Sequence, residues 1–97
     1  MEKETQWVDQ RFTENLIKEG IPSDKQELFY LLSLLPKWIH KNGEFYILHL
    51  YRDERWNAAY STTSGLVLHT EVGRSMADAV GRLTVYLSER GELKKET

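Results

Sequence analysis

The sequence predicts an α+β domain in which N-terminal helices and one C-terminal helix flank a three-stranded antiparallel β-meander. Near both ends of the chain, apolar residues recur every three or four positions, which is typical of amphipathic helices. Between these segments, over residues 44–70, short aromatic and aliphatic runs alternate with polar turn residues, a pattern typical of strands joined by tight connections. The length of 97 residues predicts a single domain, 1–97, with flexible ends at 1–5 and 92–97.

The first helix is predicted over residues 6–19. Val8, Phe12 and Leu16 are four positions apart and therefore share one helical face. Gly20 suits the position after a helix end, and Pro22 prevents the helix from continuing.

The second helix is predicted to begin at Ser23, because Ser23 and Gln26 have the spacing of a capping box. The run 28–35 that follows is apolar around most of a helix, so we expect it to be largely buried. After Pro36 we predict a short helical extension over 37–40, and then a turn at Asn42-Gly43.

Three strands follow, over residues 44–52, 56–62 and 66–70, with turns at 53–55 and Ser64-Gly65. The chain then enters a last helix, for which Ser75 is the predicted cap. The apolar stripe of this helix has spacings of three and four, and we predict that it packs on one face of the sheet. The stripe consists of Met76, Val80, Leu83 and Leu87.

Both faces of the first strand are apolar, since alternate side chains along a strand point to opposite sides. One face carries Tyr46, Leu48 and Leu50, and the other carries Phe45, Ile47, His49 and Tyr51. A sheet with one face in water shows cleaner alternation of apolar and polar residues. We therefore expect the second face to be covered, by the N-terminal helix or by another protein chain.

Composition narrows the classes of function. The chain has no cysteine, which excludes disulfides, thiolate catalysis and cysteine-ligated zinc. Its net charge is −2, with the charges interspersed, so a nucleic-acid ligand is disfavoured. The start of the chain has mixed charges and no leader pattern, and its longest apolar cluster, 28–35, is too short for a membrane span. We expect a cytoplasmic protein that does not bind membranes.

Few residues suggest chemistry. His40, His49 and His69 lie singly on different elements and lack the spacing of metal ligands. The adjacent carboxylates of Asp53 and Glu54 lie in a turn, where a glycosidase pair held across a cleft is not expected. The hydroxyls of 61–64 have no histidine near them in sequence, which leaves a small hydrolase as the third-ranked hypothesis. We predict no catalytic residue, metal or cofactor.

Two surfaces remain as binding candidates. The leading hypothesis is a non-enzymatic protein-interaction module, with a homodimer as one form, that binds through a sheet face. That face comprises Phe45, Ile47, His49, Tyr51, Val67 and His69. The alternative is a nucleic-acid-binding module, because arginines beside aromatic residues suit single strands. Its candidate contacts are Arg52, Arg55, Arg74 and Arg82, near Tyr51 and Trp56.

Two resemblances bear on these hypotheses. The order of elements resembles the α-β-β-β-α order of double-stranded RNA-binding domains, but residues 75–78 stand where those domains carry a lysine-rich helix start. The chain also resembles small uncharacterised proteins of bacteriophages and prophages. That resemblance covers about the C-terminal two thirds of the chain, in 34–39 with Asn42-Gly43 and in 77–93. It implies no known activity and no functional residue.

Overall fold

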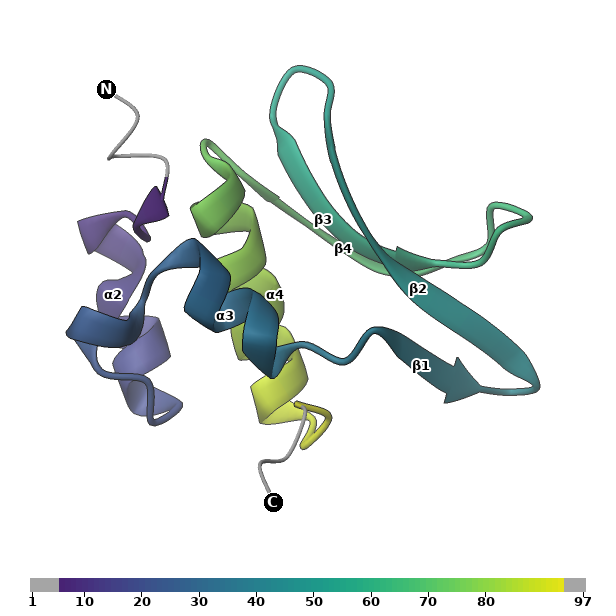
Figure 1. The fold of residues 1–97 in the computed structure, drawn as a ribbon, viewed down its shortest axis with the longest axis horizontal. Helices are drawn as coiled ribbons and strands as arrows, with labels where there is room; N and C mark the ends of the chain where they lie inside the picture. Colours follow the sequence, from purple (N-terminus) through teal and green to yellow (C-terminus); the bar gives the residue numbers. More distant parts are fainter. Residues whose placement is uncertain (1–5, 94–97) are drawn as a thin grey trace.

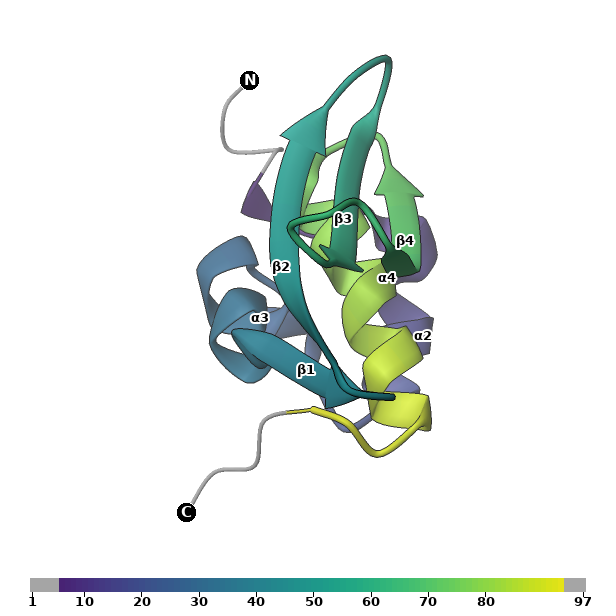
Figure 2. The same cartoon turned by 90° about the vertical axis from the view of Figure 1, so that its right-hand side faces the viewer.

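The computed structural model describes residues 6–93 and contains a four-stranded antiparallel sheet with helices on one side (Figures 1 and 2). The strands, in spatial order, are β1 (Trp38–Lys41), β2 (Glu44–Arg52), β3 (Trp56–Ser61) and β4 (Val67–Gly73). The helices are α2 (Gln10–Lys18), the 3-10 helix η1 (Ser23–Lys25), α3 (Leu28–Leu34) and α4 (Met76–Glu89). The predicted α+β class is confirmed, but the sheet has four strands and not three.

The additional strand is β1, which corrects our prediction of a helical extension over 37–40. Lys41 pairs with Glu44, so Asn42 and Gly43 form a two-residue hairpin turn. Their φ angles are 52° and 79°, the left-handed values that such turns require. This turn matches the twist of paired strands, so the segment before it pairs with β2 and does not continue the helix.

The start of the first helix also differs from the prediction. Helix α2 begins at Gln10 and not at residue 6, because the carboxylate of Asp9 caps it by accepting from the backbone amide of Arg11. Before the helix, Trp7 forms an isolated β-bridge with Glu27, and the amide of Val8 donates to the carbonyl of Gln26 over 3.1 Å. Val8 therefore precedes the helix, and its side chain is buried in the core.

The predicted capping box at Ser23 and Gln26 is wrong. The side-chain amide of Gln26 is buried and donates to the carbonyl oxygens of Ile21 (3.0 Å) and Thr13 (3.2 Å). It therefore does not reach back to Ser23. Only the short helix η1 forms there, and α3 starts later, with Glu27 as its cap.

Helix α4 lies across β3 and β4, with α3 and α2 packed against it. Its predicted cap is confirmed, since the hydroxyl of Ser75 accepts from the amide of Asp78 over 3.1 Å. Val80, Leu83 and Leu87 are fully buried, so the apolar stripe forms the centre of the core between sheet and helices.

The junction between β4 and α4 requires glycine at position 73. A Cβ atom there would lie 2.5 Å from the backbone nitrogen of Ala79 and 2.7 Å from Cβ of Asp78. A Cβ atom essentially never lies within 3.0 Å of a non-bonded atom in a relaxed structure. Gly73 therefore lets the end of the sheet approach the first turn of α4.

The expectation of flexible ends falls mainly on residues 1–5 and 94–97, which lie outside the described residues. Of the other two residues in that expectation, Glu92 forms an ion pair with Lys41 (2.7 Å), and Leu93 packs against the core. Among residues 6–93, no helix has the length and hydropathy needed to cross a membrane.

Candidate functional site

The sheet face turned away from α4, here called the outer face, carries none of the described helices (Figure 2). Strand pairing defines its members, because residues opposite each other on neighbouring strands point to the same side. They are Trp38 and His40 of β1; Phe45, Ile47, His49 and Tyr51 of β2; Asn57, Ala59 and Ser61 of β3; and Val67, Thr70 and Val72 of β4.

Large apolar side chains of the outer face are exposed. The exposed fraction is 55% for Trp38, 52% for Phe45, 39% for Ile47, 47% for Tyr51 and 56% for Val67. Helix α2 packs against α4, on the other side of the sheet. Of our two expectations for this face, cover by the N-terminal helix is therefore wrong.

Among the described residues, no lysine, arginine, aspartate or glutamate lies on the outer face, which includes His40 and His49. The strands contain four charged residues, and all of them occupy the alternate positions, on the side of the helices. They are Lys41, Glu44, Arg52 and Glu71. An exposed sheet face normally carries polar and charged residues in alternation with a buried apolar face. The outer face is exposed but lacks lysine, arginine, aspartate and glutamate on all four strands, which is the opposite of this usual pattern.

An aromatic group forms one end of the outer face. The ring of Phe45 meets Trp38 edge to face, with centroids 5.1 Å apart, and stacks on His40 at 4.3 Å. The sequence reasoning missed Trp38 and His40, because it assigned their segment to a helix. The Asn42-Gly43 pair was the signal that could have identified them, since it is typical of a two-residue hairpin.

His69, which we predicted to belong to this face, lies on the opposite one. An irregularity between Tyr60 and Ser61 places Val67 opposite Ser61 but His69 opposite the buried Tyr60. Such a bulge shifts the alternation by one residue, and the following side chains change sides. The imidazole of His69 stacks on Tyr86 of α4, with centroids 3.5 Å apart.

The three histidines are not brought together. His40 and His49 are on the outer face, whereas Nε2 of His69 is hydrogen-bonded to Oε2 of Glu71 at 2.6 Å on the helix side. Within residues 6–93, no group of three histidine or carboxylate side chains has the geometry of a metal site.

The turn residues that we considered for chemistry have structural partners. The carboxylate of Asp53 accepts from the amide of Arg55 (3.0 Å) and from the side chain of Asn57 (3.1 Å), and these bonds lower the pKa of Asp53. The hydroxyl of Thr62 contacts that of Ser64 (3.0 Å) and accepts from the amide of Leu66. Both sets of bonds fix the turns at the two ends of β3.

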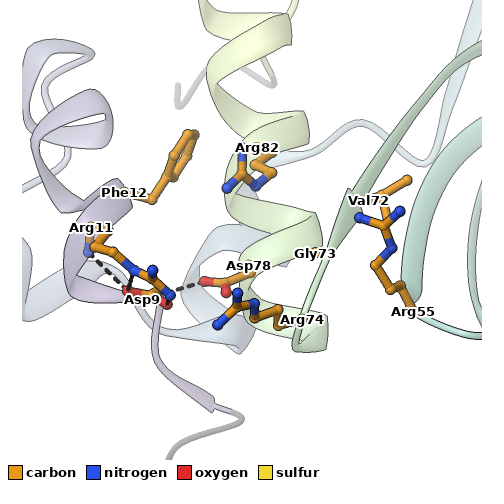
Figure 3. Close-up of a pocket in the computed structure, with 9 residues that line it drawn as sticks. All are labelled: Asp9, Arg11, Phe12, Arg55, Val72, Gly73, Arg74, Asp78 and Arg82. Atoms are coloured by element: carbon orange, nitrogen blue, oxygen red, sulfur yellow. Dashed lines mark hydrogen bonds and ion pairs between the residues drawn. The ribbon is translucent and has the colours of Figure 1, made fainter.

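A cleft of about 440 Å³ lies where α2, the end of β4 and the start of α4 meet (Figure 3). Four arginines and two aspartates contribute most of its polar lining, which also includes Phe12, Val72 and Gly73. The charged residues are Arg11, Arg55, Arg74, Arg82, Asp9 and Asp78. The structure thus brings together three of the four arginines that we predicted as nucleic-acid contacts.

The fourth predicted arginine lies elsewhere. The guanidinium of Arg52 lies 5.8 Å from the ring centroid of Trp56, and Arg52 does not line the cleft. The sequence also gave no indication of Arg11 or Asp9, because helix α2 reaches the cleft only through packing that joins residues about 70 positions apart.

Both aspartates of the cleft are engaged by the protein. Asp9 accepts from the side chain of Arg11 (3.2 Å) and from its backbone amide (2.9 Å), which lowers the pKa of Asp9. The buried carboxylate of Asp78 accepts from the backbone amide of Asp9 over 2.6 Å, which ties α2 to α4.

Comparisons with protein-family models, with curated proteins and with solved structures found no match to this chain. The outer face and the arginine-lined cleft are therefore the two candidate sites of this protein.

Proposed function

We propose that this protein is a non-enzymatic interaction module that forms a homodimer by packing the outer face of one copy against the outer face of a second. The observation that carries the proposal is an exposed, aromatic-rich sheet face whose described residues include no lysine, arginine, aspartate or glutamate. Exposed apolar patches of this kind mark sites of association. Within the same proposal the module acts in the cytoplasm, a compartment that suits a cysteine-free chain.

A second copy suits this face for electrostatic reasons. In a symmetric dimer the same patch lies on both sides of the interface, so any charge on the patch would approach its own copy or be buried without a partner. The described residues of the outer face include no lysine, arginine, aspartate or glutamate that would have this effect. The aromatic residues of this face, Trp38, Phe45 and Tyr51, are of the types that are enriched in the cores of interfaces.

The area of the outer face indicates how tightly two copies are expected to bind. The nine residues of β2 at about 3.3 Å each, and three spacings of about 4.8 Å between strands, give a footprint of about 30 by 14 Å. Two copies would bury on the order of 800 Å² in total, which is below the roughly 1,200 Å² of a stable specific interface and in the range of weak, transient ones. We therefore expect a reversible dimer with a micromolar dissociation constant.

A nucleic acid is a weaker candidate for this face. Aromatic side chains can stack on bases, but binding also needs cations that contact the phosphates. The lysine and arginine residues of the strands, Lys41 and Arg52, are on the helix side. The outer face thus supports stacking but not phosphate contact.

Sedimentation velocity over a range of protein concentrations tests the proposal. The wild-type protein should shift from monomer to dimer as its concentration rises through the micromolar range. Phe45→Lys places a charge in the outer face and should keep the protein monomeric, because the dimer would bury that charge without a partner.

Phe29→Lys is the matched control. Phe29 is 63% exposed but lies on α3, away from the outer face. This variant should dimerise as the wild-type protein does. A wild-type protein that stays monomeric at high micromolar concentration, or equal loss of dimer in both variants, would contradict the proposal. Circular dichroism of each variant establishes that the fold is intact.

A further inference from the structure

The geometry points to a second binding site, whose lining shares Val72 with the outer face: the arginine-lined cleft binds a small phosphate-bearing anion. The cleft is formed by the start of α2 and the junction of β4 with α4. The inference depends on the charge balance of its lining and on which guanidinium groups already have partners.

The lining carries an excess of two positive charges, from four arginines and two aspartates. Arg11 is paired with Asp9 at 3.2 Å. Arg74 and Arg82 have no carboxylate oxygen within 4 Å, and their side chains donate no hydrogen bond, among the residues that the structure describes. Their N–H donors therefore face solvent in the cleft and are available to an anion.

Both guanidinium groups line the cleft, and a contact with Phe12 holds that of Arg82. In Figure 3 the side chain of Arg74, from the segment just before α4, and that of Arg82, from within α4, extend toward α2, whereas Arg55 stands apart beside Val72. The guanidinium of Arg82 lies 4.7 Å from the ring centroid of Phe12, an arrangement that fixes its position through a cation–π contact.

A phosphate group suits these donors better than a carboxylate does. Guanidinium forks bind phosphate oxygens in pairs, and a phosphate monoester carries close to two negative charges at neutral pH. That charge matches the excess of the lining. A long nucleic-acid backbone is a poorer match, because it needs cations spaced along successive phosphates, and Arg52 is outside the cleft.

Titration of the 97-residue chain with inorganic phosphate, followed by NMR of backbone amides and arginine Nε–H groups, tests the inference. Saturable shifts are expected at Arg74 and Arg82. Arg74→Gln and Arg82→Gln should each weaken binding by about tenfold or more, the scale of one hydrogen bond to a charged group. Arg52→Gln, an exposed arginine outside the cleft, is the matched control and should bind as the wild-type protein does.

Two further titrations distinguish phosphate binding from a general effect of ionic strength and from binding of a nucleic acid. Sodium chloride at matched ionic strength should give no saturable shift. A single-stranded DNA oligonucleotide without terminal phosphates should bind no more tightly than inorganic phosphate. The inference is overturned by non-saturable shifts, by equal weakening in Arg52→Gln, or by tighter binding of the oligonucleotide. None of these results depends on whether the protein dimerises.

Discussion

Replacement of Leu83 by alanine tests how the core is built. Leu83 is fully buried at the centre of α4, within the cluster that joins sheet and helices. Truncation removes three carbon atoms, and at about 0.8 kcal/mol per buried methylene this corresponds to about 2.4 kcal/mol of lost transfer free energy. If the neighbouring side chains do not close the cavity, the total loss rises to about 5 kcal/mol.

Equilibrium unfolding in urea, followed by circular dichroism and tryptophan fluorescence, gives the free energy of unfolding for the wild type and Leu83→Ala. Glu89→Ala, an exposed position on the same helix, is the control and should change this free energy by less than about 0.5 kcal/mol. A loss below about 0.5 kcal/mol in Leu83→Ala would refute the assignment of this helix face to the core.

Two further substitutions test the region around the cleft. Gly73→Ala should lower the free energy of unfolding by about 1–3 kcal/mol or more, because its Cβ would lie 2.5 Å from the nitrogen of Ala79; an unchanged thermal midpoint would contradict this. Hydrogen bonds from Arg11 hold the pKa of Asp9 below its ordinary value of 3.8. The ionised carboxylate therefore stabilises the fold above pH 3.8, and this contribution is lost as the pH falls through the folded-state pKa. Asp9→Asn should therefore weaken the pH dependence of the free energy of unfolding below pH 3.8. If urea unfolding shows the same pH dependence for this variant as for the wild type, the role of the Asp9–Arg11 pair is contradicted.

The elements that the sequence predicted well are those determined by neighbouring residues. Strand β2 and helix α4 have long apolar patterns, and the cap at Ser75 is a local hydrogen bond. Strand β1 has only four residues, and its extended conformation depends on pairing with β2. Gln26 forms bonds to Thr13 and Ile21 that no local capping pattern reveals.

For the candidate sites too, the sequence predicted only what neighbouring residues determine. Alternation along β2 correctly grouped Phe45, Ile47, His49 and Tyr51, because a regular strand keeps its period of two. The bulge after Tyr60 broke that period and moved His69 to the other side. The cleft was beyond sequence reasoning, since its two walls meet only through the packing of α2 on α4.

Isotope-filtered NMR on a mixture of ¹³C-labelled and unlabelled protein tests the central claim most directly, because it detects only contacts between two copies. Our proposal predicts intermolecular nuclear Overhauser effects that involve Ile47 and Val67 of the outer face and that disappear in Phe45→Lys. Their absence at concentrations where sedimentation detects a dimer, or their location on α2 or α3, would contradict the claim that the outer face joins the two copies.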